Sequence, residues 1–156
     1  PDLAIAHFNL GHILCDIGKL KEAELSTRKA IKLQPNYAMA HYNLGSILSD
    51  LGLLEEAEFS TRRAIEIQPN YAIAHSNLGT ILNDLGQLKE AKVSTLKAIK
   101  LKPDLVEGYN IMASIYRRLG NKNEAISYAE KALTIRPWSL ESLYGLNHTC
   151  EINSTS

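Results

Sequence analysis

A thirteen-residue stretch recurs through this chain at a constant spacing of 34 residues. Its clearest copy is Ala40-His-Tyr-Asn-Leu-Gly-Ser-Ile-Leu-Ser-Asp-Leu-Gly52. Close copies run over 6–18 and 74–86, and a weaker one over 108–120. A fixed period of this length indicates an array of stacked structural repeats. Such an array has no central core, because each unit buries its apolar face against its neighbours.

The repeat divides the chain into four units, 1–34, 35–68, 69–102 and 103–136, each opening on a proline. We expect a closing helix over 137–150, with 1–150 forming one solenoid, and a tail or linker over 151–156. The chain begins with Pro1 and not Met, at the same phase as the other prolines. This start favours a fragment of a longer chain.

Each unit is predicted to form two helices. Apolar residues recur at helical spacing in the first, and small residues mark its contact with the second, which runs from about 20 to 33. Gly45 lies in mid-helix, where glycine costs about 1 kcal/mol, so we expect close backbone contact there. Gly52 stands where the helix must stop. The residues after the prolines are predicted to cap the first helices. These are Asp2, Asn36, Asn70 and Asp104.

Composition excludes several classes of protein. Lys plus Arg and Asp plus Glu number 17 each, which argues against a nucleic-acid partner, because phosphate binding needs a basic surface. No apolar run reaches the ~18 residues that a membrane span needs. Cys15 and Cys150 lie four units apart, too far for a disulfide within one molecule. This arrangement fits a reducing compartment, so we expect a cytoplasmic protein.

The repeat resembles the tetratricopeptide repeat (TPR) family. Its pattern is matched by Leu44, Gly45, Leu48, Gly52, Ala57, Ala64 and Pro69. The resemblance implies an all-α, right-handed superhelical solenoid of helix–turn–helix units, with first helices lining a concave wall. The chain departs from the pattern where His7, His41 and His75 replace a frequent Trp, and where Thr27, Thr61 and Thr95 replace a frequent aromatic. The Asn-Leu-Gly sub-pattern is similar to the repeats of O-linked N-acetylglucosamine transferase, whose matching asparagines grip peptide main chains.

Polar residues at one helical face of each unit form a candidate binding ladder. Its members are Asn9, Asn43, Asn77, Phe8, Tyr42, His12, Asp16, Asp50 and Asp84. An asparagine offers both a donor and an acceptor to a peptide backbone. Rungs ~10 Å apart would meet every third residue of a strand that rises ~3.3 Å per residue. The aspartates favour a neutral or basic peptide. The alternative is that these side chains bond neighbouring units or face water.

The fourth unit changes this face. Ile111 replaces the asparagine, and Arg117 and Arg118 follow. These arginines could accept a carboxylate or phosphate, or simply face solvent. Glu107 could complete a capping box with Asp104.

The sequence shows no pattern typical of catalysis. The three histidines at 7, 41 and 75 are one repeat apart, too far for a shared metal, and fit a packing role. Cys15 and His12 could touch, but no orienting group or oxyanion donor accompanies them. We therefore expect a non-enzymatic interaction module without cofactor, metal or membrane contact, binding an extended peptide or partner segment. Two alternatives stay open. One is a spacer or substrate-presenting arm of a larger glycosyl- or sulfo-transferase. The other is a scaffold that self-associates end to end through the uncapped first repeat.

Overall fold

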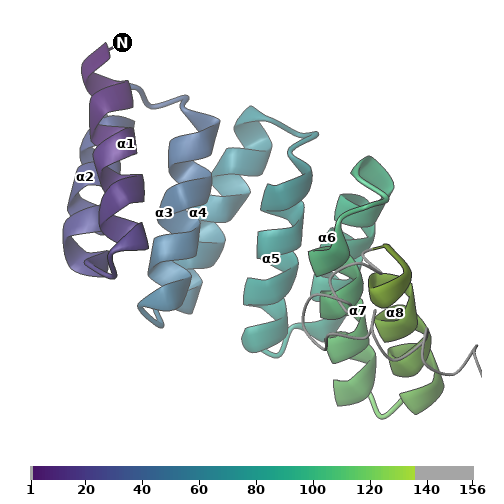
Figure 1. Ribbon diagram of the computed structural model, residues 1–156. Helices are drawn as coiled ribbons and strands as arrows, with labels where there is room; N and C mark the ends of the chain where they lie inside the picture. The colour runs from purple at the N-terminus through teal and green to yellow at the C-terminus, as the bar shows by residue number, and fades with distance from the viewer. Residues whose placement is uncertain (1, 136–156) are drawn as a thin grey trace, which may run out of the picture.

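The computed structural model describes residues 2–135, which form eight helices in four pairs. These are α1 (Asp2–Asp16), α2 (Leu20–Leu33), α3 (Ala38–Asp50), α4 (Leu54–Ile67), α5 (Ala72–Asp84), α6 (Leu88–Leu101), α7 (Val106–Arg118) and α8 (Lys122–Ile135). The pairs follow one another in chain order along an elongated row (Figure 1). The second helices α2, α4 and α6 each pack on the first helix of their own unit and on that of the next, and α8 packs on α7. The all-α repeat fold is confirmed, whereas the expected closing helix and tail, 137–156, lie outside the described residues.

Glycine ends the first helix of each unit, as the sequence predicts. Gly52 has a φ of +77°, a left-handed conformation that costs glycine little. The turn is closed by backbone hydrogen bonds from Leu53 N to Leu48 O and from Gly52 N to Ser49 O, both 2.9 Å. This is the Schellman arrangement, which satisfies the last carbonyl groups of a helix. The connection to the second helix therefore needs only a short turn in every unit.

The predicted side-chain caps are wrong. Helices α3, α5 and α7 have Tyr37, Tyr71 and Leu105 at their N-cap positions, and no side-chain cap bond forms there. Asn36 instead occupies the turn before the helix, one position too early to reach the first free amide groups. The same displacement applies to Asn70 and Asp104, so a capping box between Asp104 and Glu107 is also excluded, and Asp2 lies inside α1.

A ring side chain, and not a side-chain cap, bonds the turn that precedes the first helix of each of the last three units. His41 Nε2 lies 2.8 Å from the Pro35 carbonyl oxygen, and His75 Nε2 lies 2.8 Å from that of Pro69. A carbonyl oxygen only accepts, so each imidazole must carry its proton on Nε2. In the fourth unit Tyr109 donates its hydroxyl to Pro103 O at 2.7 Å. His41 and His75 therefore have the structural role that their spacing predicted.

The two helices of a unit touch most closely at the mid-helix glycine. A Cβ built on Gly45 would overlap Thr61 Oγ1 and lie 3.2 Å from Ala57 O, both on α4. Gly11 and Gly79 meet Thr27 and Thr95 in the same way. All three threonines are fully buried. The predicted close contact is confirmed, and it places threonine where the family often has an aromatic residue.

The apolar stripe of each first helix is covered by the unit before it. Leu44 and Leu48 of α3 pack with Ile31 of α2. On α1, the first in the row, the corresponding stripe stays open within the described part of the chain. Ile13 is 57% exposed, whereas Ile47 at the same position of the next unit is 0% exposed. A helix stripe is therefore core only where a second helix precedes it.

Candidate functional site

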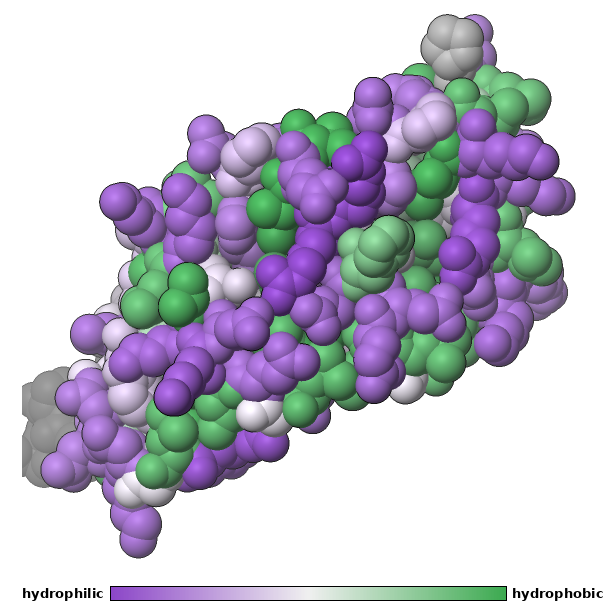
Figure 2. Space-filling view, turned by 180° about the vertical axis from the view of Figure 1, so that it is seen from behind, coloured by the Kyte–Doolittle hydropathy of each residue, from purple (hydrophilic) through white to green (hydrophobic). Residues whose placement is uncertain are grey.

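The first helices of adjacent units contact one another along one side of the row. Contacts of α1 with α3, α3 with α5, and α5 with α7 recur, whereas successive second helices touch at most marginally. We call the surface made by α1, α3, α5 and α7 the inner wall. The opposite face of the molecule is mostly hydrophilic, with separate hydrophobic patches (Figure 2). A row of matching first helices is the part of this fold where repeated side chains can act together.

Aromatic pairs join the first two junctions of the inner wall. The Phe8 ring lies 5.0 Å from the Tyr37 ring, and the Tyr42 ring lies 5.4 Å from the Tyr71 ring, between centroids. Such tilted pairs stabilise by about 0.5–1.5 kcal/mol beyond their buried area. Phe8 is only 9% exposed, so its ring is a packing residue and not an open contact for a partner. At the third junction Ser76 occupies the position of the ring, and the aromatic pairing stops.

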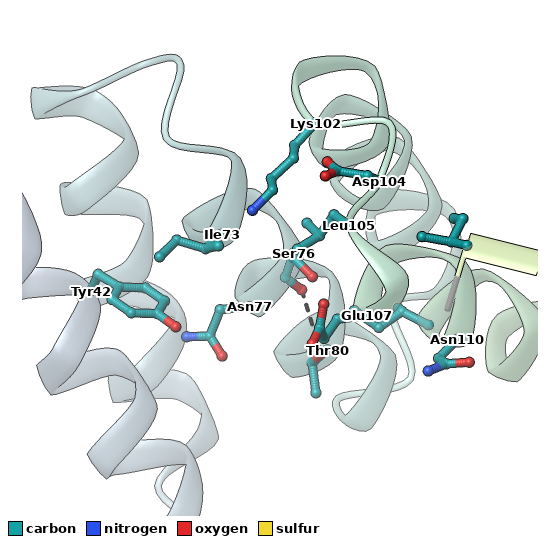
Figure 3. Close-up of a pocket in the computed structure, with 12 residues that line it drawn as sticks. Tyr42, Ile73, Ser76, Asn77, Thr80, Lys102, Asp104, Leu105, Glu107 and Asn110 are labelled. Carbon is teal, nitrogen blue, oxygen red and sulfur yellow. Dashed lines mark hydrogen bonds between the residues drawn. The ribbon is translucent and has the colours of Figure 1, made fainter. Parts of the chain in front are cut away.

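A cavity of about 810 Å³ opens at this interruption. It is lined by Tyr42, Ile73, Ser76, Asn77, Thr80, Lys102, Asp104, Leu105, Glu107, Asn110, Ile111 and Ile135. These residues come from α3, α5, α7, the α6–α7 turn and the end of α8 (Figure 3). A cavity of this size, lined by apolar and polar side chains in similar measure, is a candidate binding site.

The polar groups of the cavity face one another across it. Tyr42 and Asn77 lie together at one end (Figure 3). Asn77 Nδ2 donates to Thr61 Oγ1 at 3.4 Å, a long bond that leaves much of the amide's capacity unused. Lys102 and Asp104 enter from the α6–α7 turn, while Glu107 lies beside Thr80. Among the described residues, none of these three charged side chains forms an ion pair.

The three predicted asparagines do not form equal rungs. Asn9 is exposed, Asn43 is buried between units, and Asn77 is half-buried and lines the cavity. Asn43 Nδ2 has no hydrogen-bond partner among the described residues. Asn43 is buried and Asn9 exposed because α2 packs against α3, whereas no described helix precedes α1. Of the three amides, only Asn77 combines accessibility with a cavity.

The predicted aspartates are exposed along the ends of the first helices. Asp16 Oδ2 lies 3.4 Å from His12 Nδ1, so these two side chains pair with each other. Asp50 and Asp84 lie at the matching positions of the next two units. Burial, together with the charges of Asp50 and Asp16, raises the pKa of the Cys15 thiol. A raised pKa lowers the thiolate fraction, so Cys15 lacks the activation of a catalytic nucleophile.

The two arginines of the fourth unit lie apart from the cavity. Arg118 donates to the backbone oxygen of Asn83 and, at 3.1 Å, to its side-chain oxygen. This contact satisfies one of the last backbone carbonyl groups of α5. Arg117 lines a separate hollow of about 370 Å³ between α7 and α8, with Ala125 and Ile126. No group of three or more His, Cys, Asp or Glu within the described range is placed to hold a metal ion.

Sequence reasoning missed much of the cavity. Ser76 could have been found by aligning the units, because it replaces the ring of Phe8 and Tyr42. From the sequence, Glu107 and Asp104 are interpreted only as helix-capping residues, and nothing there singles out Lys102. Lys102 and Asp104 lie in the α6–α7 turn and Glu107 lies in the first turn of α7. They reach the same cavity as α5 because α7 packs against α5, a contact that no spacing along the chain reveals.

An all-α array of helix pairs with a lined cavity on one wall defines a repeat-type interaction scaffold. Four models of the tetratricopeptide repeat family match the chain, described as TPR repeat over 11–52 and tetratricopeptide repeat over 38–71, 61–93 and 106–137. The chain belongs to this family. No curated protein matches its sequence.

Solved structures repeat the architecture. MamA superposes with a TM-score of 0.79 at 28% identity, covering 88% of this chain and 81% of that one. PilF of Pseudomonas aeruginosa has a TM-score of 0.79 at 23% identity, over 86% and 61%. The first TPR of Spaghetti (RPAP3), bound to the HSP90 peptide SRMEEVD, has a TM-score of 0.74 at 24% identity, over 76% and 94%. No described helix of our chain has the length and apolarity to cross a bilayer.

Proposed function

We propose that this array binds an extended segment of a partner protein along its inner wall, with the cavity beside Asn77 as the main contact. The observation that carries the proposal is the cavity of about 810 Å³ at the break in the aromatic pairing. A lined hollow of this size is the default candidate for a binding site. The family supports the class of function, since one similar structure holds a peptide.

The chemistry of the lining suits a main chain. Asn77 and Asn110 each offer a donor and an acceptor, the two groups that an extended backbone also presents. Tyr42 and Ile73 supply apolar surface beside them. An extended segment presents alternate side chains to one face, so one side chain can enter while neighbouring amides pair with the asparagines. This differs from the even ladder expected from sequence, because Asn43 is covered.

The partner segment is expected to be neutral to basic. Asp50 and Asp84 are exposed on the inner wall, and neither forms an ion pair with another described residue. Carboxylates along a surface raise the local concentration of cations and repel acidic chains. Salt would weaken this preference, because exposed charges are screened within about 8 Å at physiological ionic strength.

Selection from a phage-displayed library of random ten-residue peptides tests the proposal. Peptides enriched on the wild-type protein are measured by fluorescence anisotropy against Ser76→Tyr, which restores the ring of the earlier units and fills the cavity. Asn77→Ala is the second variant, because it removes the amide without adding bulk. We expect binding to fall at least tenfold with Ser76→Tyr and about threefold to tenfold with Asn77→Ala, the loss of one hydrogen bond.

The matched control is Phe59→Ser on the second-helix side, where the ring is 76% exposed and outside the cavity. This variant should bind as the wild type does. Circular dichroism of each variant checks that the helices remain. If the enriched peptides bind Ser76→Tyr and Asn77→Ala as tightly as the wild type, the inner-wall proposal is wrong and a spacer role gains support.

A second candidate is end-to-end self-association through α1. Leu10 and Ile13 are exposed there, although their counterparts Leu44 and Ile47 are buried by the preceding second helix. The surface is therefore shaped for a helix of that type, which a second copy can supply. Because such a head-to-tail contact can repeat, sedimentation equilibrium should show an average mass above the monomer that grows with concentration and that Ile13→Lys abolishes. A wild-type monomer at high concentration would exclude this candidate.

A further inference from the structure

The cavity on the inner wall carries charges that the binding of a main chain does not explain. Lys102, Asp104 and Glu107 all point into or over it, and together they leave a net charge of −1. Each of these side chains is exposed, and within the described range none is engaged in an ion pair. Charged side chains that line a cavity and lack a protein partner favour a ligand group of the opposite charge.

The charges are separated within the cavity. Lys102 and Asp104 come from the same turn, but the amino group of Lys102 extends toward Ile73, away from the Asp104 carboxylate (Figure 3). Glu107 lies on the other side, near Ser76 and Thr80. Two carboxylates against one amino group leave these side chains with a net charge of −1, and neither carboxylate is paired with Lys102.

Apolar side chains also line the cavity. They are Ile73, Leu105 and Ile111, with the ring of Tyr42 at one end. A long aliphatic chain that ends in a cation matches such a lining, because lysine and arginine bury their methylene stems and keep the charged head near polar groups. A carboxylate-bearing side chain is shorter and would face two like charges. An aromatic side chain would leave Glu107 partly desolvated without a partner, which is unfavourable.

We propose that the cavity is a pocket for a lysine or arginine side chain of the bound segment, with Glu107 as its principal ion-pair partner and Asp104 as the second. This inference rests on the proposed function and adds the residue that determines specificity. The aliphatic stem lies over Ile73 and Ile111, and the cationic head lies between the two carboxylates. The extended backbone on either side is left to Asn77 and Asn110.

The peptide library provides the test when it is selected in parallel on two proteins. One is the wild type, and the other is Glu107→Gln combined with Asp104→Asn, which keeps the shape and removes both charges. Peptides enriched on the wild type should share a Lys or Arg at one position, and those enriched on the double variant should not. Glu66→Gln, an exposed carboxylate on α4, is the matched control and should keep the basic preference.

Affinities then measure the pocket directly. An enriched peptide is compared with the same peptide carrying norleucine in place of its Lys, or citrulline in place of its Arg. We expect binding to the wild type to weaken about 3- to 10-fold, the range for two partly exposed ion pairs, and to change less than 2-fold on the double variant. The difference should disappear in 1 M salt, where the screening length is about 3 Å.

Two results would overturn the inference, and they differ from those that defeat the proposed function. Enriched peptides that depend on Ser76 but show no basic preference leave inner-wall binding intact and exclude a cation pocket. Enrichment of Asp or Glu at the shared position would make Lys102 the selecting group instead. If no enriched peptide is sensitive to Ser76→Tyr, the proposed function itself fails.

Discussion

Replacing Gly45 by alanine sets a gain in helix propensity against a steric overlap with the neighbouring helix. Alanine in a helix interior is more favourable than glycine by about 1 kcal/mol. Here, however, the new Cβ would overlap Thr61 Oγ1 and approach Ala57 O to 3.2 Å. Thr61 is fully buried, and rotating it would bring its methyl group toward the same space. Overpacking of this kind costs about 1–3 kcal/mol, so we expect a net loss of about 1 kcal/mol in the free energy of unfolding.

Urea denaturation followed by circular dichroism at 222 nm measures this change. A double-mutant cycle with Thr61→Ala tests the cause, because removing the hydroxyl and methyl makes room for the new Cβ. In the Thr61→Ala background, Gly45→Ala should be neutral or stabilising, which gives a coupling energy of about 1 kcal/mol or more. The weak bond from Asn77 to Thr61 is lost in both arms of this cycle and therefore cancels.

Gly52→Ala is the control for this experiment. No atom lies within 4 Å of a Cβ there, but φ is +77°, so its cost of about 1–2 kcal/mol is conformational. That cost should not depend on residue 61. If Gly45→Ala alone raises stability by about 1 kcal/mol, then helix propensity prevails and the close-contact explanation is refuted.

Two further predictions concern burial and pH. Ile47→Ala should lower the free energy of unfolding by about 2–5 kcal/mol, whereas Ile13→Ala at the matching position should cost less than about 1 kcal/mol; equal losses in urea titrations would mean that the α1 stripe is covered in solution. Burial, and then the neighbouring Tyr42 and Tyr37, raise the pKa of Tyr71 to about 12. Because the unfolded tyrosine ionises near 10, the folded state binds its proton more tightly, and this contribution to stability is present below about pH 10 and is lost as pH rises toward 12. Between pH 9 and pH 11 the urea midpoint should fall less in Tyr71→Phe than in the wild type. An equal fall in the two proteins would contradict the assignment of the raised pKa to Tyr71.

The repeat spacing alone determined most of the architecture. Gly52 marks a helix end and Gly45 a close contact because glycine's conformational freedom and small size have local consequences that recur every 34 residues. The histidines at 41 and 75 likewise act within their own unit, on a proline six residues before. Features set by near neighbours in the chain were therefore largely predictable, except for the helix caps, because α3 and α5 begin one residue later than caps at Asn36 and Asn70 require.

Only the tertiary structure decided which inner-wall residues are available. Asn9, Asn43 and Asn77 occupy identical positions in the repeat, yet one is exposed, one is buried and one lines a cavity. The exposure of each amide depends on whether a second helix precedes its unit. It also depends on whether the neighbouring junction holds an aromatic ring, as at Tyr42, or a serine, as at Ser76. Glu107, in the first turn of α7, joins the cavity for the same reason, because α7 packs against α5. Packing between units is a long-range property, so a pattern that repeats within each unit does not contain it.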